Sequence, residues 1–120
     1  MEFQSQKDKI MYYAKAEFYK NGYSKATLKN IAESAETNSG LILYHYKAKE
    51  QLARCIYTDF YRKIEDRVDE YVELNINNAL YRQILVSYIY YGIIFGDPNN
   101  TRFYSDISNE FKSNRVMHQE

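Results

Sequence analysis

The sequence predicts an all-α protein, and three features of its composition and patterning support this. Four glycines and one proline in 120 residues leave few positions that break a helix. Apolar residues recur three and four positions apart along most of the chain, which is the spacing of one helix face. Fourteen tyrosines and six phenylalanines, with no tryptophan, mean that aromatic rings supply much of the core.

The first predicted helix covers residues 7–21. Its apolar face consists of Ile10, Met11, Ala14 and Phe18. Gly22 follows at the position where a left-handed cap is favoured, and Tyr23 is placed to fold back on the last turn. These residues define both the helix and its end.

Two short helices follow in close succession. Thr27 is either an N-cap or a surface threonine, and Leu28, Ile31, Ala32 and Ala35 give the next helix its apolar side. After a gap at residues 36–38, with Asn38 as a second N-cap candidate, another helix covers residues 39–46. So short a connection favours a helix-turn-helix, although many helical proteins contain tight corners of this kind.

A long amphipathic helix is predicted to begin after Lys47 and Ala48. The apolar stripe of this helix drifts around the helix axis, so it could pack against two neighbouring elements in turn. The stripe consists of Leu52, Ile56, Phe60, Ile64, Val68 and Val72. The opposite side carries a charge run that we interpret as a solvated face: Arg62, Lys63, Glu65, Asp66, Arg67, Asp69 and Glu70.

Two more helices complete the prediction. After a polar break at residues 75–78, the segment from about 79 to 95 is apolar nearly all round, which predicts burial on several sides. Residues 96–100 form the clearest stop in the chain. The last helix is expected from Thr101 to about Arg115, with an apolar face of Phe103, Tyr104, Ile107 and Phe111.

Charge is balanced overall but uneven along the chain. Sixteen basic residues match sixteen acidic ones, which argues against nucleic-acid binding by bulk positive charge. Residues 1–54 nevertheless hold nine Lys or Arg against six Asp or Glu, and residues 55–120 hold seven against ten. This polarity favours two different roles at the two ends of the molecule.

Composition also excludes several classes of protein. The single cysteine, Cys55, rules out an intramolecular disulfide and fits a reducing cytoplasm. We find no secretory signal, no apolar segment that could span a membrane, no metal-type Cys/His spacing and no catalytic constellation. We therefore expect a cytoplasmic protein that is not an enzyme and has no metal, no cofactor and no membrane partner.

Residues 10–52 resemble the DNA-binding domain of the TetR family of bacterial transcriptional regulators. The resemblance is carried by four segments at the right internal spacings: FYKNGY at 18–23, TLKNIA at 27–32, GLILYHY at 40–46 and KAKEQL at 47–52. It implies a helix-turn-helix DNA-binding domain at residues 1–49 and a helical ligand and dimerisation domain at 50–120. Family members normally have a longer second domain, so the chain is either a piece of a longer protein or a short natural member.

The resemblance further implies which residues meet double-stranded DNA. Thr27 and Lys29 match positions that reach phosphate or a nearby base, while Tyr44, His45 and Lys49 match backbone contacts. Base reading would fall to Ser39, Leu41, Leu43, Tyr44 and His45, with Gly40 allowing close approach. Four lysines would neutralise phosphates and so release counterions from the DNA: Lys25, Lys29, Lys47 and Lys49. The alternative for His45 and for the lysines is a plain surface role. Tyr44 is the better candidate to face DNA, because Tyr46 fills the family's aromatic core position.

The sequence departs from the family pattern at several positions. Glu17 replaces an apolar residue, Leu43 replaces a tyrosine, and Ala48 replaces a Ser or Asn cap, which costs about 1 kcal/mol. Glu36 stands where glycine is frequent, and a left-handed conformation there would cost roughly 1 kcal/mol. The recognition helix has no arginine, so we expect an operator rich in A·T pairs that is read partly through its shape.

The aromatic residues of the second part admit three interpretations. A ligand pocket for an unidentified hydrophobic effector would be lined by Tyr81, Tyr88, Tyr91, Phe95, Phe103 and Tyr104. A plain core is the second interpretation, and an uncovered patch that leads to self-association is the third.

These readings combine into one leading function and two alternatives. The leading one is a repressor that binds a palindromic operator as a homodimer and is released by its ligand. The alternatives are a constitutive DNA-binding factor and a helical protein-interaction module.

Overall fold

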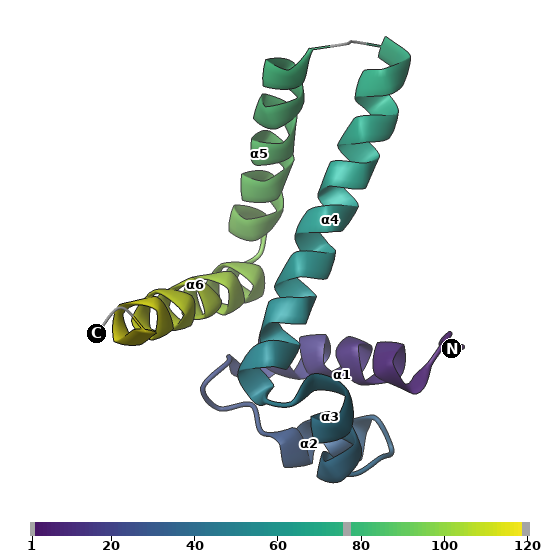
Figure 1. Cartoon of the computed structure of the whole chain (residues 1–120), viewed down its shortest axis with the longest axis vertical. Helices are drawn as coiled ribbons and strands as arrows, with labels where there is room; N and C mark the ends of the chain where they lie inside the picture. Colours follow the sequence, from purple (N-terminus) through teal and green to yellow (C-terminus); the bar gives the residue numbers. More distant parts are fainter. Residues whose placement is uncertain (1, 76–77, 119–120) are drawn as a thin grey trace.

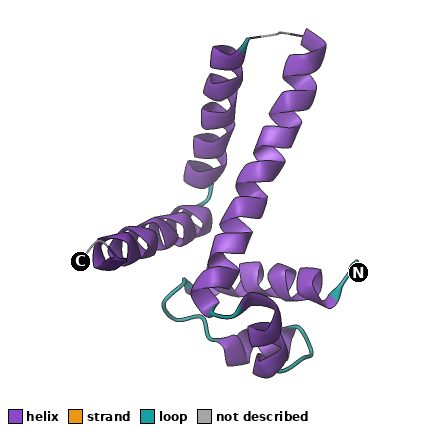
Figure 2. Cartoon of the chain, viewed as in Figure 1, coloured by secondary structure: helices purple, strands orange, loops and turns teal. Residues whose placement is uncertain are grey.

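The computed structural model of the chain describes the backbone of residues 2–75 and 78–118 and the side chains of residues 2–72 and 78–110. The described ranges contain helices and no strand, which confirms the all-α prediction (Figure 2). The helices are α1 (Gln6–Asn21), α2 (Leu28–Ser34), α3 (Ser39–Tyr46), α4 (Lys49–Asn75), α5 (Ala79–Gly96) and α6 (Pro98–His118). Helices α1 to α3 gather at one end of α4, and α5 returns beside α4 from its other end (Figure 1).

The helix ends follow the capping residues of the sequence. The Thr27 hydroxyl accepts from the backbone N–H of Asn30 at 3.1 Å, and Asn38 Oδ1 accepts from the N–H of Leu41 at 2.8 Å. Both residues are therefore N-caps, as predicted. Gly22 ends α1 with φ of 83°, a value that favours glycine because a side chain would be strained there.

The turn between α2 and α3 contains a strained residue. Glu36 has φ of 56°, so the left-handed conformation expected of it is present. Its N–H donates to the carbonyl of Glu33 at 3.2 Å, and that of Thr37 donates to the carbonyl of Ala32 at 2.9 Å. This pair of bonds is a Schellman motif, which satisfies the last carbonyls of α2 with a glutamate where glycine is usual.

One hydrophobic core joins the first three helices to α6. Phe18 of α1 is fully buried and its ring stacks on that of Phe103 of α6, with centroids 5.5 Å apart. The same cluster includes Ile31, Ile42 and Tyr46 of the two short helices. The boundary predicted between residues 49 and 50 stays a prediction, and the core runs continuously across it.

The apolar stripe of α4 packs into two hydrophobic clusters, as its drift around the helix axis predicted. Leu52 and Ile56 belong to the first core, whereas Ile64 and Val68 pack with Val86 of α5 in a second. Phe60 contacts both clusters. The stripe thus connects the two ends of the molecule.

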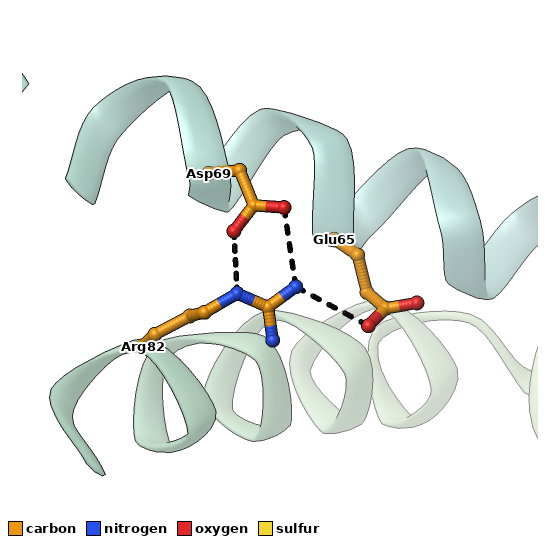
Figure 3. Close-up of polar contacts among 3 residues, drawn as sticks. All are labelled: Glu65, Asp69 and Arg82. Carbon is orange, nitrogen blue, oxygen red and sulfur yellow. Dashed lines mark hydrogen bonds and ion pairs between the residues drawn. The ribbon is translucent and has the colours of Figure 1, made fainter. Parts of the chain in front are cut away.

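An ionic clamp joins α4 to α5 near their connection. The Arg82 guanidinium donates to both carboxylate oxygens of Asp69 and, at 3.3 Å, to one oxygen of Glu65 (Figure 3). These acidic residues belong to the charge run interpreted as a solvated face. Asp69 is exposed and Glu65 is half-buried, so both carboxylates remain at the surface. The ion pairs with Arg82 add a partner on another helix, which the local pattern of α4 does not reveal.

Two predictions about α5 and α6 need correction. The last helix begins at Pro98 rather than Thr101, because proline is tolerated at a first helical position and the Asp97 carboxylate accepts from the N–H of Asn99 at 2.8 Å. Helix α5 is not buried on several sides, since only Val86 and Ile94 of it are buried. The predicted core role of Phe111 lies outside the described side chains.

Candidate nucleic-acid interface

Helix α3 has one side in the core and one side free. Ile42 and Tyr46 are buried, and this leaves the residues on the other side of the helix at the surface. Gly40, Leu43 and Tyr44 are exposed, while Ser39, Leu41 and His45 are half-buried. The structure therefore brings the predicted base-reading residues together on one short helix, although Leu41 also packs against the core.

Two tyrosines on α3 have opposite environments. Tyr46 is 1% exposed, and its hydroxyl donates to the main-chain carbonyl of Lys7 at 2.8 Å. Burial raises the pKa of its phenol well above the ordinary value. Tyr44 is 71% exposed and lies edge-on to the ring of His45, with centroids 5.1 Å apart. A ring pair at the surface of a helix can make contacts by both its edges and its polar atoms, as reading of base edges requires.

Gly40 has a local role in addition to the predicted one. A Cβ built on it would lie 3.1 Å from the Asn38 Oδ1 that caps the helix. Any side chain would therefore crowd the cap. The absence of a side chain keeps the N-terminus of α3 both capped and open to a close neighbour such as a DNA groove.

Lys47 ends α3 in an unusual conformation. Its φ is 68° and its ψ is −36°, and the N–H of Ala48 donates to the carbonyl of Tyr46 at 2.7 Å across it. This is a tight three-residue turn of a strained type. The exposed Lys47 amino group lies 3.4 Å from the Tyr44 carbonyl, within reach of any anion at the end of the helix.

The start of α2 presents a second exposed group of residues. Thr27, Lys29 and Lys25 are all exposed, and the Thr27 hydroxyl serves as the N-cap acceptor. The ammonium groups of Lys25 and Lys29 are free to approach phosphate from this side. The predicted backbone contacts at this helix thus have the access to solvent that they require.

Lys49 lies in a different environment from the one expected of a phosphate contact. Its ammonium donates to the main-chain carbonyls of Tyr23 at 2.9 Å and of Ala26 at 3.2 Å. It also lies over the Tyr23 ring, 4.4 Å from the centroid. Burial lowers the pKa of Lys49 and raises that of Tyr23 to about 12. In this position Lys49 joins α4 to the segment between α1 and α2.

The predicted pocket residues lie in different environments. Phe103 and Tyr104 are buried in the core, where Tyr104 shares a hydrogen bond of 2.9 Å with the hydroxyl of Tyr19. Tyr88 and Tyr91 lie on the exposed side of α5. A groove of about 340 Å³ between α5 and α6 does bring Tyr91, Phe95 and Tyr104 together. Tyr81 is exposed near the start of α5.

Neither metal nor membrane features are found in the described part of the molecule. Residues 2–72 and 78–110 contain no group of His, Cys, Asp or Glu side chains arranged to hold a metal ion. None of the helices described combines the length and hydrophobicity that a bilayer crossing needs.

Helices α2 and α3, which only residues 35–38 separate, form a helix-turn-helix, an arrangement typical of proteins that bind DNA. Residues 10–56 match the family model of the bacterial regulatory proteins, tetR family. Through this segment, which is less than half of the chain, the protein is similar to the TetR family, as the four sequence segments predicted.

Two curated relatives show how far the likeness extends. The chain is 46% identical over 46 residues to the HTH-type transcriptional regulator QacR of Staphylococcus aureus. The aligned segment covers 38% of this chain and 24% of that protein. The chain is also 34% identical over 56 residues to the HTH-type transcriptional repressor KstR2 of Mycolicibacterium smegmatis. That aligned segment covers 47% of this chain and 27% of that protein. The matched segment thus spans about a quarter of the length of either relative.

Proposed function

We propose that the chain is a transcriptional repressor of the TetR type that binds a palindromic operator in double-stranded DNA as a homodimer. The observation that supports this most directly is the exposed face of α3, where Tyr44 is 71% exposed while its neighbour Tyr46 is buried. In the proposal, α3 enters the major groove and a second copy places another α3 one helical turn away. A cytoplasmic location belongs to the same proposal.

In the proposal, each residue of this surface has a role set by its chemistry. Lys25, Lys29 and Lys47 neutralise phosphates and make binding depend on salt. Tyr44, His45, Leu43, Ser39 and Gly40 meet base edges and sugars, with Leu43 against a thymine methyl group. Because no arginine is available for guanine, A·T pairs are favoured.

A gel-shift titration with the DNA upstream of the gene, repeated at several salt concentrations, tests the proposal. Tyr44→Ala should weaken binding by about tenfold or more, since one good base contact contributes roughly 1–3 kcal/mol. Tyr71→Ala is the matched control, because Tyr71 is also exposed but lies on the far part of α4. Salt-independent binding, or equal losses for both variants, would argue against α3 as the reading helix.

Release of DNA by a small hydrophobic molecule is the second part of the proposal. The groove of about 340 Å³ between α5 and α6 supports it, because aromatic rings and the Ser105 and Ser108 side chains line it together. The dispersal of the other predicted pocket residues favours the alternative, a DNA-binding factor without ligand control. Screening aromatic compounds for loss of the gel shift distinguishes the two.

A further inference from the structure

Helix α3 is flanked by two residues that combine a side chain with a positive φ. In the described part of the chain only Glu36, before α3, and Lys47, after it, have this conformation, with φ of 56° and 68°. Glycine would avoid the strain at both positions, because it has no Cβ to crowd the backbone. Strain of this kind persists where the surrounding structure enforces it, and it clusters at functional sites.

The backbone at Lys47 is imposed by the connection to α4. Helix α3 ends at Tyr46 and α4 begins at Lys49, so two residues carry the whole change of direction. The N–H of Ala48 donates to the carbonyl of Tyr46 at 2.7 Å, which closes a three-residue turn centred on Lys47. Glycine would form this turn with less strain. The turn therefore explains the positive φ at position 47, but it does not explain a lysine there.

The Lys47 side chain lies back along α3 against Tyr44. Its ammonium is 3.4 Å from the main-chain carbonyl of Tyr44 and 5.9 Å from the centroid of the Tyr44 ring. An ammonium over the face of an aromatic ring is attracted to it. The same ring is 71% exposed and lies edge-on to the ring of His45. Lys47 thus contacts the exposed ring that α3 presents at the predicted DNA surface.

The neighbouring lysine of α4 is engaged elsewhere. The half-buried Lys49 donates to the main-chain carbonyls of Tyr23 and Ala26, which lie between α1 and α2. Lys47 is exposed. Lys47 is therefore the residue that keeps an ammonium at the surface beside Tyr44.

We propose that Lys47 is a positioning residue for the reading of DNA: its ammonium holds the Tyr44 ring in place and binds the phosphate beside the base that this ring contacts. The inference rests on the proposed function, because it requires α3 to lie in the major groove. The strain at position 47 then has a physical reason, since glycine would relieve it but remove both contacts. Glu36 is the contrasting case, because phosphate repels its carboxylate.

The first test separates strain from binding. Lys47→Gly should raise the urea midpoint of unfolding but lower the affinity for the DNA upstream of the gene by about tenfold. It should also reduce the slope of log affinity against log salt by about 1. Glu36→Gly is the matched control, which should raise the midpoint without weakening binding. A lower midpoint or an unchanged affinity for Lys47→Gly would overturn the inference.

The second test measures the coupling between Lys47 and Tyr44. Tyr44→Ala should lower the affinity for the same DNA by about tenfold in the wild-type chain. In a Lys47→Gly background, where the ring is no longer held, the loss should be less than about threefold. In a Lys29→Ala background the loss should stay at about tenfold, because Lys29 lies on α2. Equal losses in all three backgrounds would mean that Lys47 does not position the ring.

A third measurement needs no DNA. In protein with labelled tyrosines, the NMR signals of the Tyr44 ring are those that Tyr44→Phe removes. They should shift in Lys47→Gly and stay in place in Glu36→Gly. DNA binding without this shift would leave the proposed function standing and overturn the inference. A shift in a chain that shows no salt-dependent DNA binding would overturn the proposed function, and the reading role of Lys47 with it.

Discussion

The guanidinium of Arg102 in α6 donates a hydrogen bond to the main-chain carbonyl of Lys20, 3.0 Å away at the C-terminal end of α1. The same group bonds the carbonyl of Tyr19. A positive charge at a helix C-terminus satisfies carbonyls that lack helical partners and interacts favourably with the helix dipole. The Arg102 hydrogen bonds and the hydrogen bond between the Tyr19 and Tyr104 hydroxyls together hold α6 against α1, which packs on the helix-turn-helix.

Replacing Arg102 with methionine should lower the free energy of unfolding by about 1–2 kcal/mol, because two bonds from a charged donor are lost. Urea denaturation measures the change. Arg62→Met is the control, since the Arg62 pair with Asp59 is exposed and lies within α4, where it contributes under about 0.5 kcal/mol. Equal shifts for the two variants would contradict the capping role.

Tyr46→Phe should lower the free energy of unfolding by about 1 kcal/mol, because the carbonyl of Lys7 loses its donor. Tyr46→Ala should lower it by about 3–5 kcal/mol, since a fully buried ring is removed. Thermal unfolding monitored by circular dichroism measures both. Tyr44→Phe should leave stability unchanged, and a loss there comparable to that of Tyr46→Phe would count against the assigned environments.

Lys29 and Lys49 should separate binding from stability. Lys29→Ala should reduce the slope of log affinity against log salt by about 1 and leave unfolding unchanged, because its side chain is exposed. Lys49→Ala should instead lower the free energy of unfolding by about 1 kcal/mol, since its ammonium bonds two main-chain carbonyls. Gel shifts and urea titrations on both variants make the comparison. If Lys49→Ala instead changed the salt dependence of binding and left unfolding unchanged, Lys49 would be a DNA contact.

Glu36→Gly should stabilise the chain by roughly 1 kcal/mol, because a left-handed residue without a side chain is less strained. Glu33→Gly is matched in charge but replaces a residue inside α2, so it should destabilise by up to about 1 kcal/mol. Opposite shifts of the urea midpoint are the expected result. Shifts of the same sign would mean that charge, rather than backbone conformation, dominates at this turn.

The clamp between α4 and α5 should weaken in acid. Hydrogen bonding and charge from Arg82 hold the pKa of Asp69 below its ordinary value of 3.8. A carboxylate whose pKa is lowered on folding stabilises the fold above its unfolded pKa, and this contribution is lost as the pH falls through the folded value. The melting temperatures of wild type and Asp69→Asn should therefore differ at pH 7 and converge below about pH 4.

The control for the acid experiment is Asp66→Asn, which removes one charge from the exposed side of the same helix. Its melting temperature relative to wild type should not follow the Asp69 profile. A difference between wild type and Asp69→Asn that persists unchanged into strong acid would show that the clamp does not act through the Asp69 charge.

Local features of the fold could be predicted because they depend on neighbours in sequence. Thr27, Asn38 and Gly22 act within three or four residues, so their caps follow from the order of residues alone. The predicted start of α6 lies three residues too late, because Pro98 is both a helix breaker and a favoured first residue of a helix. The hydrogen bond from the N–H of Asn99 to the Asp97 carboxylate shows that Pro98 is here the first residue of the helix.

Contacts between distant segments could not be predicted in the same way. Arg82 and Asp69 are 13 residues apart, and Arg102 and Lys20 are 82 apart, so no periodicity links them. The same limit applies to Lys49, because the carbonyls that receive its ammonium belong to a segment more than 20 residues earlier. A family pattern places such a residue near DNA without showing which way its side chain points.

The sequence by itself determined the helices, their caps, the resemblance to the TetR family and the set of residues on α3, because these depend on local spacing and residue type. Tertiary structure decided which of those side chains are free. It buried Tyr46 and exposed Tyr44, and it left Tyr88 of α5 exposed while Phe103 of α6 is buried. It also placed the Lys49 ammonium on two main-chain carbonyls and left Lys29 exposed. The physical reason is that exposure depends on which distant surface packs against a helix, and residue order along that helix does not contain this information.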